Sequence, residues 1–183
     1  QLARDARARD IGLIMDVVLN HIGSSHWWMR DLPAPDWINY GGKFTATHHV
    51  RESLQDPHGA EADRRSFADG WFVETMPDLN QRNPFLATYL IQNTLWWIEY
   101  AGLSGLRVDT YPYSDRAFLT EWSRRVMQEF PSLNVVGEEW SGSPVTGPAI
   151  TSMGEPLIAP AKSYSDWPSG RYSKPAMNSA GSW

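Results

Sequence analysis

Cysteine is absent from this chain of 183 residues, and two other features that often reveal a protein class are missing. Without cysteine there is no disulfide, no thiolate metal site and no cysteine nucleophile, although the cellular compartment stays open. No apolar run approaches the roughly 18 residues that a membrane-spanning helix needs. No block of basic residues occurs and the net charge is −5, which argues against nucleic acid as a partner.

The composition that remains is that of a folded domain with many tryptophans. Hydrophobic residues make up 42% and charged residues 20%, which excludes a wholly disordered chain. The ten tryptophans have two interpretations, a Trp-rich core or a set of flat apolar faces suited to sugar rings. Residues 141–183 are rich in Ser, Gly, Pro and Ala without a clear period, so we expect an irregular tail there.

Strand-like and helix-like segments alternate along residues 11–140. Apolar, β-prone runs cover residues 11–19, 105–110 and 134–140, and the first is continuous enough for a parallel strand covered on both faces. Apolar residues at three- and four-residue steps predict helices over 85–100, ended by Gly102, and over 114–130. Alternating strands and helices are typical of a parallel sheet, hence of the α/β class.

The spacing of the strands predicts part of a (β/α)₈ barrel with an insertion. Asp109 and Glu138 are 29 residues apart, about one strand–helix–strand repeat of a barrel of ~250 residues. Asp16 and Asp109 are 93 residues apart, so roughly 60 residues must form an insertion. Residues 22–75 hold scattered Pro and Gly without a sustained period, and we expect an inserted irregular lobe beside the strand ends. Residues 1–21 and 76–140 are then the partial barrel.

Each predicted strand carries a carboxylate, and carboxylates at the C-terminal ends of barrel strands are typical of catalytic sites. Arg107 and Asp109 are two apart on a strand and share a face. A guanidinium beside a carboxylate lowers the pKa of that carboxyl, and an ionised Asp suits attack on the anomeric carbon of a sugar. The alternative is an ion pair that only fixes the strand.

Glu138 and Glu139 are neighbours at a strand end and point to opposite faces. In an apolar setting supplied by Val136 and Trp140, one of them would have a raised pKa and act as a general acid. The alternative is a solvated start of a loop.

Polar residues also follow the first strand. Asn20 and His21 suit hydrogen bonds to hydroxyls, and an Asn oxygen can ligate calcium; the alternative is that Asp16, Asn20 and His21 only fix the junction. His48 and His49 indicate an exposed loop rather than a metal site. Residues 76–80 on their own indicate a turn and the start of a helix.

Four segments together resemble signatures of the α-amylase family of glycoside hydrolases: DVVLNH at 16–21, GLRVDT at 105–110, GEEW at 137–140 and MPDLN at 76–80. The Met-Pro opening of the last is similar to the neopullulanase, cyclomaltodextrinase and maltogenic amylase branch. The resemblance covers residues 10–140. It implies the third to fifth strands of a (β/α)₈ (TIM) barrel with a domain inserted after the third strand, and retaining hydrolysis of α-glucosidic bonds in starch-type glucans, maltooligosaccharides or cyclodextrins.

The resemblance also implies roles for single residues. Asp109 would be the nucleophile, Glu138 the acid/base, and Arg107 the residue that positions and ionises Asp109 beside the substrate. His21 would contact the sugar next to the cleaved bond, and Tyr113 and Trp140 are further candidates for substrate contact.

A second group of residues would hold the architecture. Asp16, Asn20 and Asp78 are structural candidates, and Asn20 would ligate calcium in calcium-dependent members. No organic cofactor is expected, and the expected partner is an α-glucan oligosaccharide. The resemblance suggests the periplasm or cytoplasm of a bacterium.

Two departures from the family pattern qualify these implications. Many members carry a Lys-His pair or a His four residues after the nucleophile, where this chain has Tyr113. The family's His-Asp signature, whose Asp stabilises the transition state, does not follow Glu138, because the last histidine is His58. We therefore expect a fragment that is inactive alone, and two alternatives stay open: a transglycosylase on the same scaffold and a non-catalytic glucan-binding relative.

Overall fold

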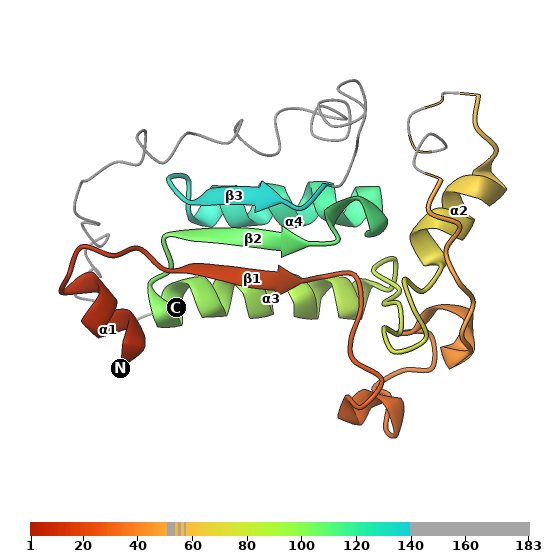
Figure 1. Ribbon diagram of the computed structural model, residues 1–183, viewed down its shortest axis with the longest axis horizontal. Coiled ribbons are helices and arrows are strands. Elements are labelled where there is room, and N and C mark those ends of the chain that lie inside the picture. The colour runs from red at the N-terminus through yellow and green to blue at the C-terminus, as the bar shows by residue number, and fades with distance from the viewer. Residues whose placement is uncertain (51–53, 55, 57, 140–183) are drawn as a thin grey trace.

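The three expected strands form one parallel sheet (Figure 1). The structure is a computed structural model, and it describes residues 1–50, 54, 56 and 58–139. The strands β1 (Ile14–Val18), β2 (Gly105–Asp109) and β3 (Asn134–Gly137) lie in the order β1-β2-β3. All three run in the same direction, so their C-terminal ends meet at one edge of the sheet. The predicted tail and Trp140 lie outside the described residues.

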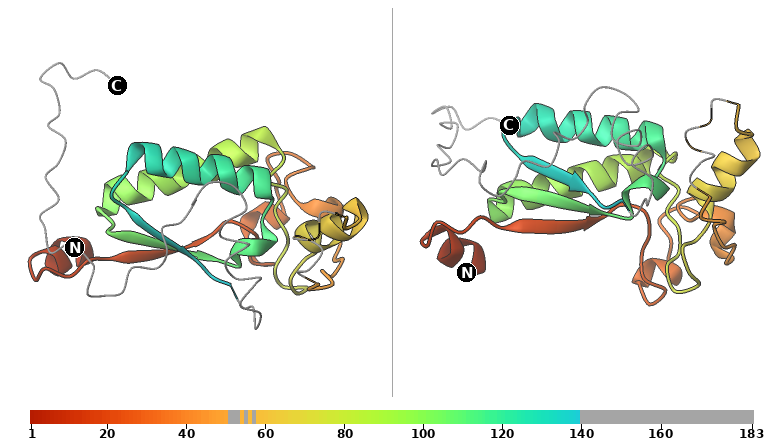
Figure 2. Two further views of the ribbon diagram at one scale, coloured as in Figure 1. Left: turned by 90° about the horizontal axis from the view of Figure 1, so that it is seen from above. Right: turned by 45° about the horizontal axis from the view of Figure 1, so that its top comes forward.

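Two long helices cover one face of this sheet, as Figure 2 shows. They are α3 (Pro84–Ala101) and α4 (Arg116–Glu129), and each connects one strand to the next. The short helix α1 (Leu2–Arg7) precedes β1. The alternation of strands and helices expected from the sequence is therefore confirmed.

The ends of α3 and α4 follow from side-chain chemistry. The Asn83 side chain accepts hydrogen bonds from the backbone N–H groups of Phe85 and Leu86, and Gly102 ends α3 in the left-handed region at φ 59°. Asp115 caps α4 by accepting from the N–H of Phe118 at 2.9 Å. Both helices therefore begin and end within a few residues of their predicted bounds.

The core lies between the sheet and these two helices. Val17, Leu106 and Val108 on the strands pack with the apolar faces of α3 and α4, and Trp122 is fully buried. The indole N–H of Trp122 donates to the Thr94 hydroxyl at 3.0 Å, which joins the two helices and satisfies both buried polar groups. Burial of this shared face is what orients the strand ends.

The expectation that the first strand is covered on both faces is wrong for the described residues. β1 spans five residues, and Ile14 and Val18 on its second face are 51% and 43% exposed. The reason is that α3 and α4 both lie on one side, and no described helix covers the other. The same open face carries the side chains of Asp16 and Arg107.

The described residues of the range 22–75 lie beyond the C-terminal ends of the strands (Figure 1). They include the 3₁₀ helices η1 (Trp27–Met29) and η2 (Asn39–Gly42), and the α-helix α2 (Glu61–Asp69). An irregular lobe is expected here from the sequence, and the helix α2 is not predicted. That helix buries Phe67 while its neighbours are mostly charged, so its sequence shows no apolar period.

The expectation of a turn and helix start at residues 76–80 is also wrong. Asp78 forms an antiparallel bridge with His21, and Leu79 forms one with Ile38. The N–H of Leu79 donates to the Asn20 carbonyl at 2.8 Å. Partners on both sides hold this segment extended, and both partners are remote in sequence.

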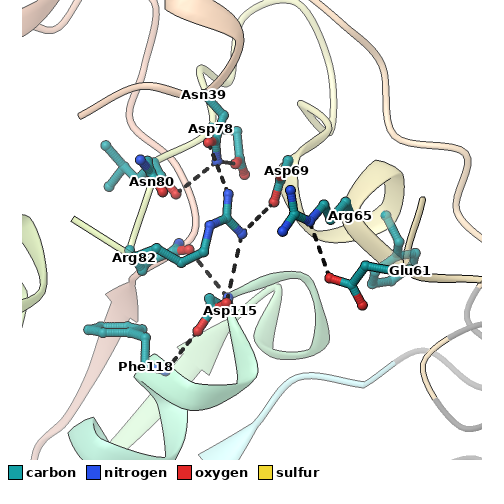
Figure 3. Close-up of polar contacts among 12 residues, drawn as sticks. Asn39, Glu61, Arg65, Asp69, Asp78, Asn80, Arg82, Asp115 and Phe118 are labelled. Carbon is teal, nitrogen blue, oxygen red and sulfur yellow. Dashed lines mark hydrogen bonds and ion pairs between the residues drawn. The ribbon is translucent and has the colours of Figure 1, made fainter. Parts of the chain in front are cut away.

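Polar side chains of residues 78–83 join the insertion to the strand ends, and we call this segment the polar joint (Figure 3). Gln81 donates to the Leu19 carbonyl at 3.0 Å and accepts from the N–H of Asp115 at 3.3 Å. Asn80 donates to the Asp36 carbonyl at 2.9 Å. The polar joint therefore contacts β1, α4 and the insertion together.

Arg82 is the cationic centre of the polar joint. Its guanidinium pairs with Asp69 at the end of α2 at 2.7 Å and lies 3.8 Å from Asp115 at the start of α4. It also donates to the Asn39 side chain at 3.3 Å. Figure 3 shows these three partners around one guanidinium, which fixes α2 relative to α4.

Asp78 is the buried carboxyl of the polar joint. It is fully buried, and its Oδ2 accepts from the Asn39 side chain at 2.7 Å. Burial raises the pKa of Asp78 well above its usual value, and the Asn39 bond together with the nearby Asn20 amide offsets only part of that rise. The folded protein therefore holds the proton of Asp78 more tightly than the unfolded chain does.

We expect the free energy of unfolding to fall as pH rises above the ordinary pKa of Asp78, because the unfolded chain then releases its proton before the folded chain does. Asp78→Asn should remove this loss, since the amide keeps an oxygen for Asn39 and never ionises. Urea unfolding at a series of pH values from 4 to 8 (roughly the range in which a raised carboxyl pKa acts) measures both proteins. Equal pH slopes for the two would contradict the assignment.

Candidate active site

The Arg107 guanidinium contacts one carboxylate on or next to each of the three strands. Nη1 of Arg107 donates to Asp16 and to Asp109, in each case at 2.7 Å, and Nη2 lies 2.5 Å from Glu138. The hydrogen bonds that Arg107 donates to Asp16 raise the pKa of Arg107, and its bond to Asp109 and the charge of Glu138 act in the same direction. The expectation that Arg107 lies within salt-bridge reach of Asp109 is confirmed.

Asp109 and Glu138 stand at the ends of adjacent parallel strands. Asp109 is the last residue of β2, and Glu138 follows β3, with its N–H donating to the Val108 carbonyl at 2.9 Å. The Glu138 carboxylate also accepts from the backbone N–H of Thr110 at 3.0 Å. Of the two neighbouring glutamates, Glu138 is therefore the one seen to share Arg107 with Asp109.

The described surroundings of Glu138 differ from the apolar setting expected from Val136, while Trp140 lies outside the described residues. Val136 is 43% exposed, and the groups that contact the Glu138 carboxylate include Arg107 and the Thr110 amide. The physical reason is the pleat, because Arg107 on the neighbouring strand and Glu138 point to the same side of the sheet. The described groups that contact the Glu138 carboxylate are therefore polar or charged.

His21 lies where the insertion begins, and its backbone forms an antiparallel bridge with Asp78. Burial lowers the pKa of His21, and the charge of Asp109 opposes that shift. The imidazole is therefore neutral near pH 7, with a donor on one nitrogen and an acceptor on the other. Such a ring can exchange hydrogen bonds with hydroxyl groups close to Asp109.

Asn20 is fully buried beside Asp78, and neither its Oδ1 nor its Nδ2 has a hydrogen bond partner among the described residues. Oδ1 of Asp78 likewise has no hydrogen bond partner among the described residues. A cation would use such oxygens, but calcium takes about six to eight oxygen ligands. Among the described residues no group of three or more His, Asp or Glu side chains is placed to hold a metal ion. Calcium at Asn20 stays a prediction.

Tyr113, a candidate for substrate contact, is 4% exposed in the short helix η4 (Tyr111–Tyr113) that follows β2. Its hydroxyl lies 2.9 Å from Nδ1 of His49, and its ring stacks on Phe67. The structure thus places Tyr113 against the insertion, and its role as a substrate contact stays a prediction. His49 is exposed, as the sequence indicated, but its bond to Tyr113 was not predicted.

Two features of the site were not predicted from the sequence. The Thr110 amide reaches Glu138 because Thr110 adopts a left-handed conformation at φ 44°, which is unusual for a β-branched residue. His49 meets Tyr113 across 64 residues of sequence. The doublet of aromatic residues in the segment TYPY was the only local sign of a packed turn.

Comparisons with known proteins identify the family of the chain. The family model "Alpha amylase, catalytic domain" matches residues 1–155. A neopullulanase 2 of Thermoactinomyces vulgaris is 30% identical over 141 residues, which cover 76% of this chain and 23% of the relative. An intracellular maltogenic amylase of Bacillus subtilis is 28% identical over 140 residues, covering 76% of this chain and 22% of the relative.

Solved structures give the same result. The α-amylase of Geobacillus thermoleovorans, in complex with acarbose, is 29% identical at a TM-score of 0.67, and the match covers 82% of this chain and 31% of that one. The chain thus spans less than a third of each of these relatives. The matches support a TIM-barrel-type fold, of which the described residues show three strands and two covering helices. The chain belongs to the α-amylase catalytic-domain family of glycoside hydrolases.

Proposed function

We propose that residues 1–140 supply the nucleophile and the acid/base of a catalytic domain that hydrolyses α-glucosidic bonds with retention of configuration. The observation that carries this proposal is the single Arg107 guanidinium that contacts both Asp109 and Glu138. It brings the two carboxylates to one place at the ends of adjacent strands. Two carboxylates at one cleft are the minimum equipment of a retaining glycosidase.

In the first step Asp109 attacks the anomeric carbon while Glu138 gives a proton to the leaving oxygen. The C–O bond of the glucosidic link breaks, and an ester between Asp109 and the sugar forms. The ion pair with Arg107 holds the Asp109 carboxylate in place for this attack. Neutral His21 binds a hydroxyl of the sugar next to the bond that breaks.

In the second step Glu138, now ionised, takes a proton from water, and the hydroxide formed attacks the anomeric carbon. The ester bond to Asp109 breaks, and the sugar leaves with its α configuration. Arg107 contacts Glu138 as well, so it can stabilise the carboxylate of whichever residue carries charge. Asp16, the third partner of Arg107, positions the guanidinium.

The substrate class rests on the relatives. A neopullulanase, a maltogenic amylase and a cyclomaltodextrinase are among them, and one solved α-amylase holds acarbose. We therefore propose starch-type glucans, maltooligosaccharides or cyclodextrins as substrates. Trp140 remains a candidate for sugar contact, Asn20 and Asp78 for support of the strand ends, and no organic cofactor is required by the two steps.

We expect Asp109→Asn to reduce kcat by about 10⁴-fold or more, since the amide is not a nucleophile. Glu138→Gln should reduce it by about 10²–10⁴-fold. The measurement is release of reducing sugar from maltooligosaccharides by the full-length gene product that contains this chain, with the anomer of the product read by NMR. Glu139→Gln is the matched control and should retain activity. A β-anomeric product, or a loss confined to Glu139→Gln, would contradict the assignment.

We expect residues 1–183 produced alone to lack ordinary amylase activity, although both carboxylates are present. In the described residues β1 and β3 are open edges of a three-stranded sheet, and one sheet face has no covering helix. A third group that stabilises the transition state is also absent after Glu138, and loss of one such preorganised group costs roughly 10²–10³ in rate. The same reducing-sugar assay, with Asp109→Asn as control, tests this. Activity at amylase rates that Asp109→Asn abolishes would show the expectation to be wrong.

A further inference from the structure

We propose that Tyr113 is a positioning residue that holds the turn after β2, and with it the Thr110 amide on Glu138, against the insertion. This inference rests on the proposed function, since it concerns how the proposed acid/base is placed. The turn consists of Thr110 and η4, and its partners in the insertion are His49, Phe67 and Phe72. We call these three rings, together with that of Tyr113, the aromatic clamp.

The turn is the structural link between Asp109 and Glu138. Thr110 directly follows Asp109, and its N–H donates to Oε2 of Glu138 at 3.0 Å. Its carbonyl accepts from the N–H of Tyr113 at 3.0 Å, which closes the turn. Thr110 sits at φ 44° and ψ 38°, a conformation that a β-branched residue keeps only where its surroundings hold it. The direction of the N–H therefore depends on what holds the turn.

The aromatic clamp holds the turn from the side of the insertion. The ring of Tyr113 stacks on Phe67 of α2, with centroids 4.4 Å apart and planes 18° apart. Phe72 packs edge-on against the same ring at 5.3 Å. The hydroxyl lies 2.9 Å from Nδ1 of His49. The face, an edge and the polar tip of Tyr113 thus each contact the insertion.

The partners of Tyr113 are themselves fixed. Phe67 is fully buried, and its carbonyl accepts from the buried Thr47 hydroxyl at 3.0 Å. The N–H of Thr47 donates to the Trp71 carbonyl at 3.0 Å. His49 follows two residues later in a left-handed conformation at φ 57°. A conformation of that kind in a non-glycine residue indicates that the surrounding contacts determine it.

The turn is also held from the opposite side by β3. The ring of Tyr111 lies so close to Gly137 that a Cβ there would stand 2.6 Å from Cγ of Tyr111. Gly137 immediately precedes Glu138, so this contact sets the distance between the turn and the acid/base. Tyr111 on one side and Tyr113 on the other leave the Thr110 amide a single direction.

The burial of Tyr113 favours a positioning role over contact with the substrate. A residue that binds sugar needs a surface that the sugar can reach, whereas Tyr113 is 4% exposed. Loss of a substrate contact raises KM, while displacement of an acid/base lowers kcat. Loss of a clamp also loosens the turn, which hydrogen exchange detects without any substrate.

The test uses the full-length gene product and the variant Tyr113→Phe, which removes the hydroxyl and keeps the ring. We expect the amides of Thr110 and Tyr113 to exchange about three- to tenfold faster, the effect of losing one hydrogen bond. We expect kcat to fall by a similar factor with KM unchanged. Tyr100→Phe is the matched control, because Tyr100 is 71% exposed on α3. It should change neither quantity.

His49 supplies a second arm. His49→Ala should have at least the effect of Tyr113→Phe, since it removes the same bond together with the ring contacts of His49, and adding Tyr113→Phe to it should change little further. His49→Asn should lie near wild type, because Asn tolerates the left-handed backbone and keeps a hydrogen-bonding group.

Unchanged exchange at Thr110 in Tyr113→Phe would overturn the proposal, and so would faster exchange with unchanged kcat. A raised KM with unchanged exchange would instead make Tyr113 a substrate contact. A wild type that cleaves no α-glucan would overturn the proposed function, while the exchange of Thr110 would still decide whether the clamp holds the turn.

Discussion

The ion pairs of Arg107 are the interaction on which the site depends. Asp16, Asp109 and Glu138 are brought within reach of one cation, on the open face of a small sheet. Three carboxylates at this separation would repel one another without it. Because the guanidinium is a planar fork with several N–H donors, it can bind all three. The strands supply the spacing, and Arg107 supplies the attraction.

Arg82 is a second cation that holds several partners together, at the edge of the insertion. Arg82 joins Asp69, Asp115 and Asn39, so that α2, α4 and the loop near η2 share one centre. Gln81 and Asn80 use backbone groups of their neighbours for the rest of the polar joint. Buried polar groups of this kind tolerate few alternative arrangements, because an unmade hydrogen bond costs more than a made one gains. The insertion is therefore held in register with the strand ends.

The two centres meet at His21, which follows β1 and pairs with Asp78 of the polar joint. Its imidazole responds to the charge of Asp109, which places it within the influence of the Arg107 cluster. The aromatic clamp forms a further connection, from α2 to the turn beside Asp109. The insertion thus reaches the site by two routes, one polar and one aromatic.

The sequence by itself determined the parallel sheet, both long helices and the identity of the central residues. Periodicity gave α3 and α4 with their caps, because capping and apolar faces are local properties. The step of two along a strand placed Arg107 and Asp109 on one face. The choice between Glu138 and Glu139 followed from the family resemblance alone. The geometry of Glu138 agrees with it.

Only the tertiary structure decided the features that depend on contacts remote in sequence. α2 has no apolar period because a single residue, Phe67, anchors it, and its partner Tyr113 lies 46 positions later. Asp78 and Leu79 are extended because His21 and Ile38, both remote in sequence, form backbone bridges with them. The polar setting of Glu138 arises from a residue on the adjacent strand and from the unusual backbone of Thr110. Each feature depends on which segments come into contact in the fold, and a local sequence pattern does not show which remote segment will contact it.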